Sequence, residues 1–191
     1  RSRWRACEAL RLRYDVSRSQ GARRRSRARS LVELALQLSD YASAVAGWLV
    51  ILDALAEDAQ HAHGTATTAG GEPRALLPEN GVLAFLGFWR TLQRAGARLN
   101  VSADDVNRLR ERVVAMGALR ELLQRTDRSL ALIGPDATAQ PGLRALRWQG
   151  ATLAELLGDP VGAARRYLQL CAGVPPDRAA LARFRALSRM L

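Results

Sequence analysis

Few side chains in this 191-residue sequence have the types and spacing of an acid–base or metal site. The only two histidines, His61 and His63, form a His-x-His pair in a polar stretch rich in Gly, Thr and Ala. Two such imidazoles could share a metal ion, but no cluster of Cys, Asp or Glu at ligand spacing accompanies them. The sequence also lacks GxSxG, HExxH and GxxxxGK, the motifs of nucleophilic hydrolases, zinc proteases and phosphate-binding loops. We therefore expect no enzyme activity, no metal and no cofactor.

The acidic pair and the two cysteines are better explained by structure than by catalysis. Asp104 and Asp105 lie just after Ser102, an order that is typical of a capped helix start with acids in its first turn. Cys7 and Cys171 are far apart and form no CxxC motif, so we expect a reduced compartment. Cys171 lies on an apolar helical stripe, where a thiol behaves as a small hydrophobic side chain.

The densest charge in the sequence is a run of arginines at the start of a helix predicted over 22–38. All 29 basic residues are arginines, against 18 acidic residues, and the net charge is +11. A GC-rich coding sequence would explain the preference for Arg over Lys. Clustered guanidinium groups also suit phosphate groups and acidic proteins, so three readings stay open: nucleic acid, an acidic protein partner, and no specific role. The run consists of Arg23, Arg24, Arg25, Arg27 and Arg29.

Two further observations bear on this run. Positive charge near a helix N-terminus opposes the helix dipole, so another group has to offset it or this end frays. Trp4 and Tyr14 could stack on bases. They share an apolar stripe with Cys7 and Leu10, however, and this spacing favours a place in the core.

The composition predicts an all-α protein. Ala, Leu and Arg dominate, and these side chains lose little freedom in a helix. We predict antiparallel helix pairs, in an α-solenoid or an irregular helical bundle. The expected regions are a basic N-terminal segment (1–21), a first helix pair (22–58), a flexible loop (59–80), a middle helix hairpin (81–126), a loop (127–142), and a second helix pair with a final helix capped by Asp177 (143–191).

Two helices within these regions carry apolar stripes that predict their buried faces. The stripe of the helix from Val82 to Ala97 consists of Leu83, Leu86, Trp89 and Leu92. The stripe that starts at Val106 continues through Leu123 as one helix.

No apolar run approaches the roughly 18 residues of a membrane span, since the longest oily stretch is Ala44 to Leu55. The sequence shows no signal peptide and no initiating Met. We expect a soluble fragment or processed protein, located in an organellar matrix (mitochondrion or plastid) or in the cytoplasm of a high-GC organism.

Two segments share a turn followed by the same pattern of side chains. When Asp40 is placed over Asp159, each Asp follows the end of a helix and starts the next one. Four residues later stands a small residue, Ala44 or Ala163, and four residues further an aromatic one, Trp48 or Tyr167. The small residue lets two antiparallel helices approach near the turn, and one turn later there is room for a ring. Pro175 and Pro176 then end the second copy.

This pattern resembles the later half of the tetratricopeptide repeat, a helix-turn-helix of 34 residues. The resemblance covers roughly a third of the chain. It implies a right-handed stack of helix pairs with a concave surface, and proteins of this kind are usually scaffolds rather than catalysts. The expected function is therefore a non-catalytic scaffold for protein–protein interaction in a larger assembly. The alternatives are an RNA-associated subunit of organellar ribosome type, docked through the arginine run, and the helical sensor segment of a larger bacterial regulator.

Overall fold

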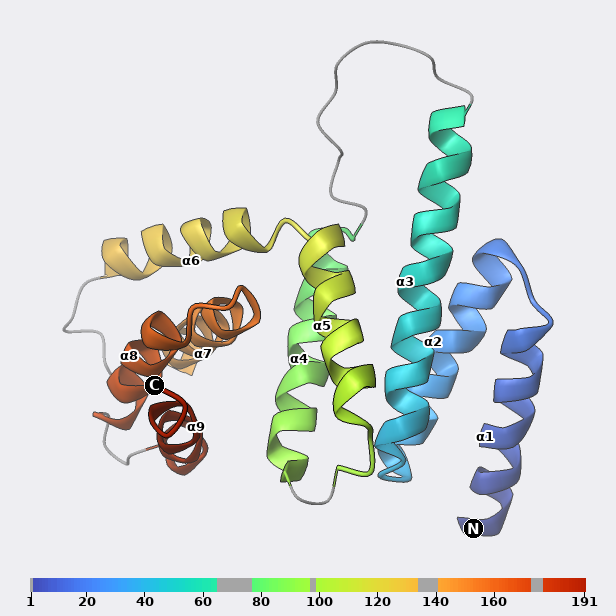
Figure 1. Cartoon of the computed structure of the whole chain (residues 1–191), viewed down its shortest axis with the longest axis horizontal. Helices are drawn as coiled ribbons and strands as arrows, with labels where there is room; N and C mark the ends of the chain where they lie inside the picture. Colours follow the sequence, from blue (N-terminus) through green and yellow to red (C-terminus); the bar gives the residue numbers. More distant parts are fainter. Residues whose placement is uncertain (1, 65–76, 97–98, 134–140, 173–176) are drawn as a thin grey trace. The chain divides into compact units, whose positions relative to one another are not determined.

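The computed structural model describes residues 2–64, 77–96, 99–133, 141–172 and 177–191 (Figure 1). Within these ranges the chain forms nine α-helices and no strand, which confirms the all-α prediction. The predicted breakers Pro175 and Pro176 lie outside the described residues. The helices are α1 (Ser2–Ser17), α2 (Gly21–Gln37), α3 (Tyr41–Gly64), α4 (Glu79–Ala95), α5 (Ala103–Met116), α6 (Leu119–Ile133), α7 (Pro141–Leu156), α8 (Pro160–Cys171) and α9 (Arg178–Ser188).

The chain divides into two compact units. Unit 1 consists of 1–78 and 95–117, and unit 2 consists of 79–94 and 118–191. The helices of the predicted middle hairpin 81–126 are divided between the two units, because α4 belongs to unit 2 and α5 to unit 1. Among the described helices, none is long and apolar enough to cross a bilayer.

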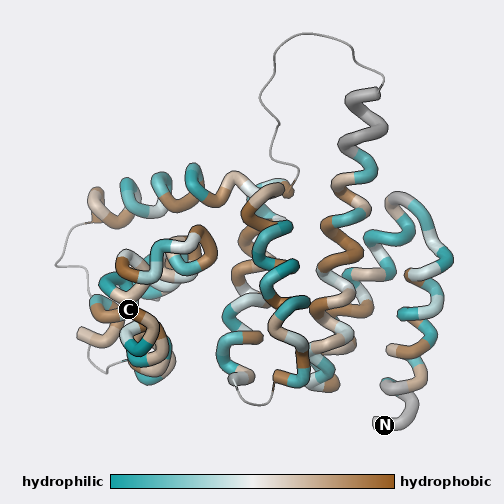
Figure 2. Tube along the Cα trace, in the orientation of Figure 1, coloured by the Kyte–Doolittle hydropathy of each residue, from teal (hydrophilic) through white to brown (hydrophobic). Residues whose placement is uncertain are grey.

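Unit 1 is organised around the antiparallel pair α2 and α3. Apolar residues follow one another along the middle of α3 (Figure 2), and Ala44, Val45 and Leu52 there are almost fully buried. The two backbones approach closely at Gly47, where a Cβ atom would lie 2.7 Å from Val32 Cγ2. A glycine in mid-helix is thus explained by the tight contact with α2.

The helix predicted from Val106 through Leu123 is in fact two helices. α5 starts at the predicted cap, where the backbone N–H of Asp105 donates to Ser102 Oγ at 3.0 Å. It ends at Met116, because Gly117 has an extended backbone (φ −103°, ψ 144°) and the Leu77 N–H donates to Met116 O at 3.0 Å. The apolar stripe continues across this break, so periodicity alone could not reveal it.

Both predicted loops are too long at their edges. α3 continues to Gly64 and α4 begins at Glu79, so the loop predicted at 59–80 is shorter on both sides. α6 extends to Ile133, well into the loop predicted at 127–142. The extension of α6 contains Arg, Ala and two Leu residues, all strong helix formers, so the helix continues past the predicted edge.

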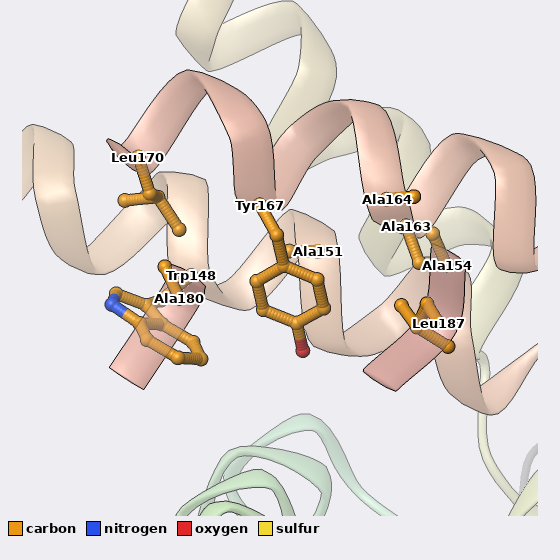
Figure 3. Packing of buried hydrophobic residues seen from close by; sticks show 9 residues of the cluster. All are labelled: Trp148, Ala151, Ala154, Ala163, Ala164, Tyr167, Leu170, Ala180 and Leu187. Atoms are coloured by element: carbon orange, nitrogen blue, oxygen red, sulfur yellow. The ribbon is translucent and has the colours of Figure 1, made fainter. Parts of the chain in front are cut away.

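Unit 2 contains the second antiparallel pair, α7 and α8, with α9 packed on α8. Near the turn between α7 and α8, the small side chains Ala154, Ala163 and Ala164 lie together, while the rings of Trp148 and Tyr167 lie further along the pair (Figure 3). This is the order of small and large residues that the sequence predicts.

The buried face of α4 agrees with the predicted stripe at Leu86, Trp89 and Leu92 but not at Leu83. Leu83 was expected in its apolar stripe but is 41% exposed, whereas Phe85 is fully buried. The Phe85 ring packs against Phe88 and Trp89, with centroids 6.2 and 5.8 Å away. Phe85 and Phe88 therefore add to a buried face that Val82, Leu86, Trp89 and Leu92 also form.

We expect Gly47→Ala to lower the free energy of unfolding. The new methyl group would collide with the stiff Val32 side chain, and overpacking of this kind costs about 1–3 kcal/mol, more than the gain of about 1 kcal/mol in helix propensity. Urea unfolding followed by circular dichroism measures the change. The matched control is Gly87→Ala in α4, where nothing lies within 4 Å of the new Cβ and propensity alone should stabilise the helix. Equal effects of the two substitutions would contradict the close approach at Gly47.

Candidate functional site

The turns before α3 and α8 have the same backbone geometry. Ser39 and Gly158 both have left-handed backbones, with φ of 57° and 81°. The N–H of Asp40 donates to Ala35 O at 2.8 Å, and the N–H of Asp159 donates to Ala154 O at 2.9 Å. These residues are equivalent in the alignment that places Asp40 over Asp159.

Each of the two aspartates caps the helix that follows it. Asp40 Oδ1 accepts from the Ser43 N–H at 3.1 Å, and Asp159 Oδ1 accepts from the Gly162 N–H at 2.8 Å. A side-chain oxygen at this position satisfies one of the free N–H groups at a helix start. Two hairpins with one turn geometry thus occur in the chain, one in each unit, while the relation to the tetratricopeptide repeat stays a prediction.

The residues predicted to pack these hairpins are all buried. Ala44, Ala163 and Tyr167 are fully buried, and Trp48 is 7% exposed. The Tyr167 ring meets Trp148 edge-on, with centroids 5.2 Å apart and planes at 70°. Such a pair adds about 0.5–1.5 kcal/mol to the burial of the two rings.

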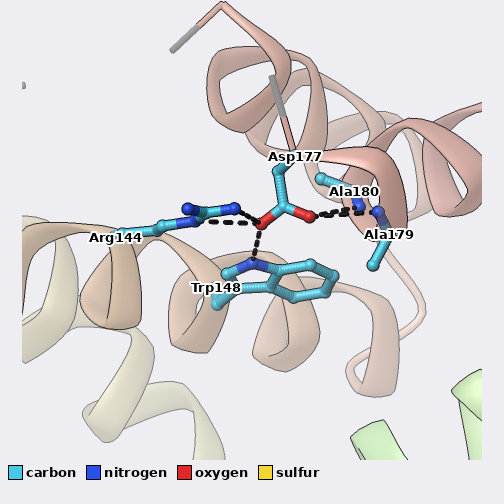
Figure 4. Close-up of polar contacts among 5 residues, drawn as sticks. All are labelled: Arg144, Trp148, Asp177, Ala179 and Ala180. Carbon is cyan, nitrogen blue, oxygen red and sulfur yellow. Dashed lines mark hydrogen bonds and ion pairs between the residues drawn. The ribbon is translucent and has the colours of Figure 1, made fainter. Parts of the chain in front are cut away.

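Asp177 is the most heavily bonded carboxylate in the described part of unit 2 (Figure 4). Its Oδ1 caps α9, as predicted, by accepting from the N–H groups of Ala179 and Ala180 at 3.0 and 3.1 Å. Its Oδ2 accepts from Trp148 Nε1 at 2.7 Å and from Arg144 Nε and Nη2 at 3.1 and 2.8 Å. One side chain therefore joins the start of α9 to α7.

Burial alone would raise the pKa of the Asp177 carboxyl. The hydrogen bonds from Trp148, Arg144 and the Ala180 N–H, together with the charge of Arg144, outweigh burial and hold this pKa below its ordinary value. The ionised form is thus favoured in the folded protein.

A second carboxylate, Glu155 of α7, joins α8 and α9. Its Oε2 accepts from the Tyr167 hydroxyl at 3.1 Å and from Arg183 Nε at 3.2 Å, and its Oε1 pairs with Arg183 Nη2. Burial, and then the charge of Glu155, raise the pKa of the Tyr167 hydroxyl. Burial opposes the charge of Arg183, but the hydrogen bond and the charge of Glu155 keep the Arg183 pKa above its ordinary value.

The arginine run is only partly available to a partner. Arg24 pairs with Glu57 of α3 at 3.1 Å, and Arg25 pairs with Asp58. These two carboxylates supply the compensation that the start of α2 requires, because they place negative charge beside its first turns. Arg27 Nη1 donates to Ser19 Oγ at 2.5 Å and to the Asp15 carbonyl at 3.3 Å.

The remaining two residues of the run, Arg23 and Arg29, are exposed, and their side chains make no ion pair or hydrogen bond with a described residue. The predicted burial of Tyr14 is wrong, since its side chain is 59% exposed. Arg18 lies over the Tyr14 ring at 5.5 Å and donates to its hydroxyl at 2.6 Å. The side chain of Trp4 lies outside the described part of the chain.

Unit 2 also contains a cavity of about 340 Å³ between α4, α7 and α9. Arg90, Gln93 and Arg94 of α4 line it, together with Trp148, Arg183 and three alanines of α9. Sequence reasoning did not identify it. The available signal was weak: four polar residues lie within five positions near the end of a helix whose middle is apolar.

The basic side chains of this cavity differ in their partners. Arg183 is paired with Glu155, but Arg90 and Arg94 form no ion pair with a described carboxylate. The Arg90 guanidinium lies 4.6 Å from the centroid of the Trp148 ring, a cation–π contact. Burial lowers the Arg90 pKa, the charge of Arg94 lowers it further, and the charges of Tyr167 and Asp177 act in the opposite direction.

Three buried polar atoms beside the cavity have no hydrogen-bond partner among the described residues. They are Arg90 Nε and both amide atoms, Nε2 and Oε1, of Gln93. An unsatisfied buried group typically costs about 1–3 kcal/mol, so such groups cluster where a ligand or water can complete them. The described residues contain no group of three or more His, Cys, Asp or Glu placed to hold a metal ion, and the side chains of His61 and His63 lie outside the description.

Comparison with known protein families, with curated proteins and with solved structures finds no match to this chain. The functional interpretation therefore depends on the geometry given above.

We expect Ser39→Gly to stabilise unit 1. A non-glycine residue with a left-handed backbone is strained by about 1–2 kcal/mol, and glycine removes this strain at the cost of a more flexible unfolded chain, for a net gain of up to about 1 kcal/mol. Chemical unfolding measures the change. Gly158→Ala at the equivalent position should have the opposite sign. A destabilised Ser39→Gly variant would show that the serine side chain is needed at this turn.

Asp177→Asn should destabilise unit 2 in a pH-dependent way. Because the pKa of Asp177 is lower in the folded than in the unfolded state, its contribution is complete above the ordinary value of 3.8 and disappears as the pH falls through the lower folded value. Near neutral pH we expect a loss of about 1–3 kcal/mol, since Arg144 and Trp148 lose a charged acceptor.

The free energy of unfolding of both proteins, measured by urea titration from pH 7 downwards, tests this. The difference in free energy of unfolding between wild type and variant should become smaller below about pH 4. The control is Glu111→Gln, which changes an exposed carboxylate of α5. Its free energy of unfolding should differ from wild type by a small amount that does not change with pH. If the difference in free energy of unfolding between wild type and Asp177→Asn stays constant with pH, the ionised Asp177 carboxylate does not stabilise the fold as described.

Proposed function

We propose that this chain is a non-catalytic helical scaffold that binds a protein partner as a subunit of a larger assembly. The observation that supports this most is the repeated hairpin, with the same left-handed turn, the same Asp cap and the same small-then-aromatic packing in α2–α3 and α7–α8. Repeated helix pairs are the building unit of solenoid proteins, which use their stacked surfaces for binding.

The charge of the chain indicates the chemistry of the partner. With a net charge of +11, the protein attracts acidic surfaces over a distance set by the ionic strength. Arg23 and Arg29 are exposed on α2 and have no described carboxylate partner, unlike Arg24 and Arg25. We therefore propose an acidic protein surface as the partner of this part of α2.

Nucleic acid would recognise the same two arginines, so the experiment has to separate the two partners. The variant Arg23→Glu/Arg29→Glu reverses both charges without breaking an ion pair seen in the structure. The matched control is Arg108→Glu/Arg128→Glu, which has the same change in net charge at exposed arginines of α5 and α6.

We expect the first variant to recover roughly tenfold less of the partner proteins than wild type does, because two charge-assisted contacts become repulsive. Quantitative affinity capture from native extract, with and without nuclease and over a salt series, is the measurement. The control should retain most of the recovered protein.

Recovery that nuclease abolishes would favour the RNA-associated alternative over a direct protein contact. Equal recovery by both charge-reversed variants would contradict a role for this surface of α2.

A further inference from the structure

The cavity of unit 2 has a surplus of positive charge that the fold itself does not use. Three arginines line it, and one of them, Arg183, is paired with Glu155. Arg90 and Arg94 have no such partner among the described residues. A guanidinium cannot lose its proton in a protein, so Arg90 and Arg94 stay charged on α4 without an ion pair of their own.

The cavity also has the size and composition of a small-molecule site. Its volume of about 340 Å³ lies within the range of ligand cavities, at the lower end. The alanines of α9 and the Trp148 ring give it apolar walls, and a few polar groups from α4 stand on one side. Small-molecule sites typically combine apolar walls with a few polar groups that fix orientation.

The hydrogen-bonding groups nearby suit an anion that also carries a donor. Arg90 Nε is a donor without a described partner, and Gln93 has both an amide donor and an amide acceptor free. The contact with the Trp148 ring fixes the position of the planar Arg90 guanidinium. A guanidinium held in place in this way favours paired hydrogen bonds to an oxyanion.

From these observations we propose that the cavity between α4, α7 and α9 binds a small phosphate monoester, with its phosphate on Arg90 and Arg94. A phosphate monoester carries nearly two negative charges near neutral pH, which matches the two guanidinium groups that have no ion pair, whereas a carboxylate carries one. A hydroxyl group on the ligand would donate to Gln93 Oε1. This site is independent of the scaffold role, because neither Arg23 nor Arg29 lines it.

The test is a titration of the whole chain with glycerol 3-phosphate, with glycerate and glycerol as smaller probes of lower charge that also carry hydroxyl groups. The readout is the NMR signal of the Trp148 indole N–H and of the Arg90 Nε–H. Glycerol 3-phosphate should shift both signals with a dissociation constant of about 1 mM or tighter. Glycerate should bind roughly tenfold more weakly, and glycerol should cause no shift.

Three variants complete the test. Arg90→Gln and Arg94→Gln should each weaken binding of glycerol 3-phosphate by at least roughly tenfold, as expected for the loss of a charge-assisted contact. Arg94 is exposed, so Arg94→Gln keeps the experiment informative if Arg90→Gln disturbs the fold. Arg128→Gln, an exposed arginine of α6 in the same unit, should bind as wild type does.

Several results would overturn the proposal. One is the absence of any shift at about 10 mM glycerol 3-phosphate, and another is full binding by both α4 variants. If glycerate binds as tightly as glycerol 3-phosphate, the site does not recognise the phosphate group. If Arg128→Gln loses as much affinity as the α4 variants, the effect is general charge attraction.

Discussion

The constraint on which both units depend is a shortage of carboxylates, since 18 acidic side chains face 29 arginines. A buried or half-buried guanidinium remains charged and needs an anion, an aromatic face or water. The fold places several of its carboxylates where helices meet. Glu57 and Asp58 bind α3 to the start of α2, and Glu155 and Asp177 bind the three last helices together. The positions of the acids therefore decide which arginines are structural and which are left over.

Asp177 shows why such a carboxylate is hard to replace. Its two oxygens satisfy backbone groups of α9, the Trp148 indole and the Arg144 guanidinium at the same time. A neutral side chain of the same shape could accept some of these bonds, but it would leave a guanidinium without its counter-charge. The Trp148 ring is held in turn between this carboxylate, the Tyr167 ring and Arg90. Removal of the acid therefore affects both the core of unit 2 and the wall of its cavity.

Local signals in the sequence were sufficient for the all-α class and for the helix caps. The Asp caps and the paired turns were predicted from a few neighbouring residues, because capping and left-handed turns are determined over five or six positions. The break at Gly117 was missed, since an apolar stripe runs through it and the partner that ends α5 comes from Leu77, far away in the chain. Tyr14 and Leu83 were placed in the core because spacing identifies a stripe but does not show how far a neighbouring helix covers it.

The candidate sites divide in the same way. The arginine run is continuous in sequence and was found at once, but its division into structural and free members depends on the acids of α3. The cavity was not predictable, because Arg90 and Arg183 are distant in sequence and only the packing of unit 2 brings them together.

The two sets of free arginines should also respond differently to salt. Exposed charges such as those of Arg23 and Arg29 are screened beyond about 8 Å at physiological ionic strength, so an acidic partner bound there depends strongly on salt. Arg90 is half-buried against an indole ring, where the local dielectric is lower and counter-ions have less access. Contacts to an anion in the cavity therefore keep more of their strength as salt rises. One excess of arginine can thus support two kinds of binding, a broad attraction at the surface and a local one in the cavity.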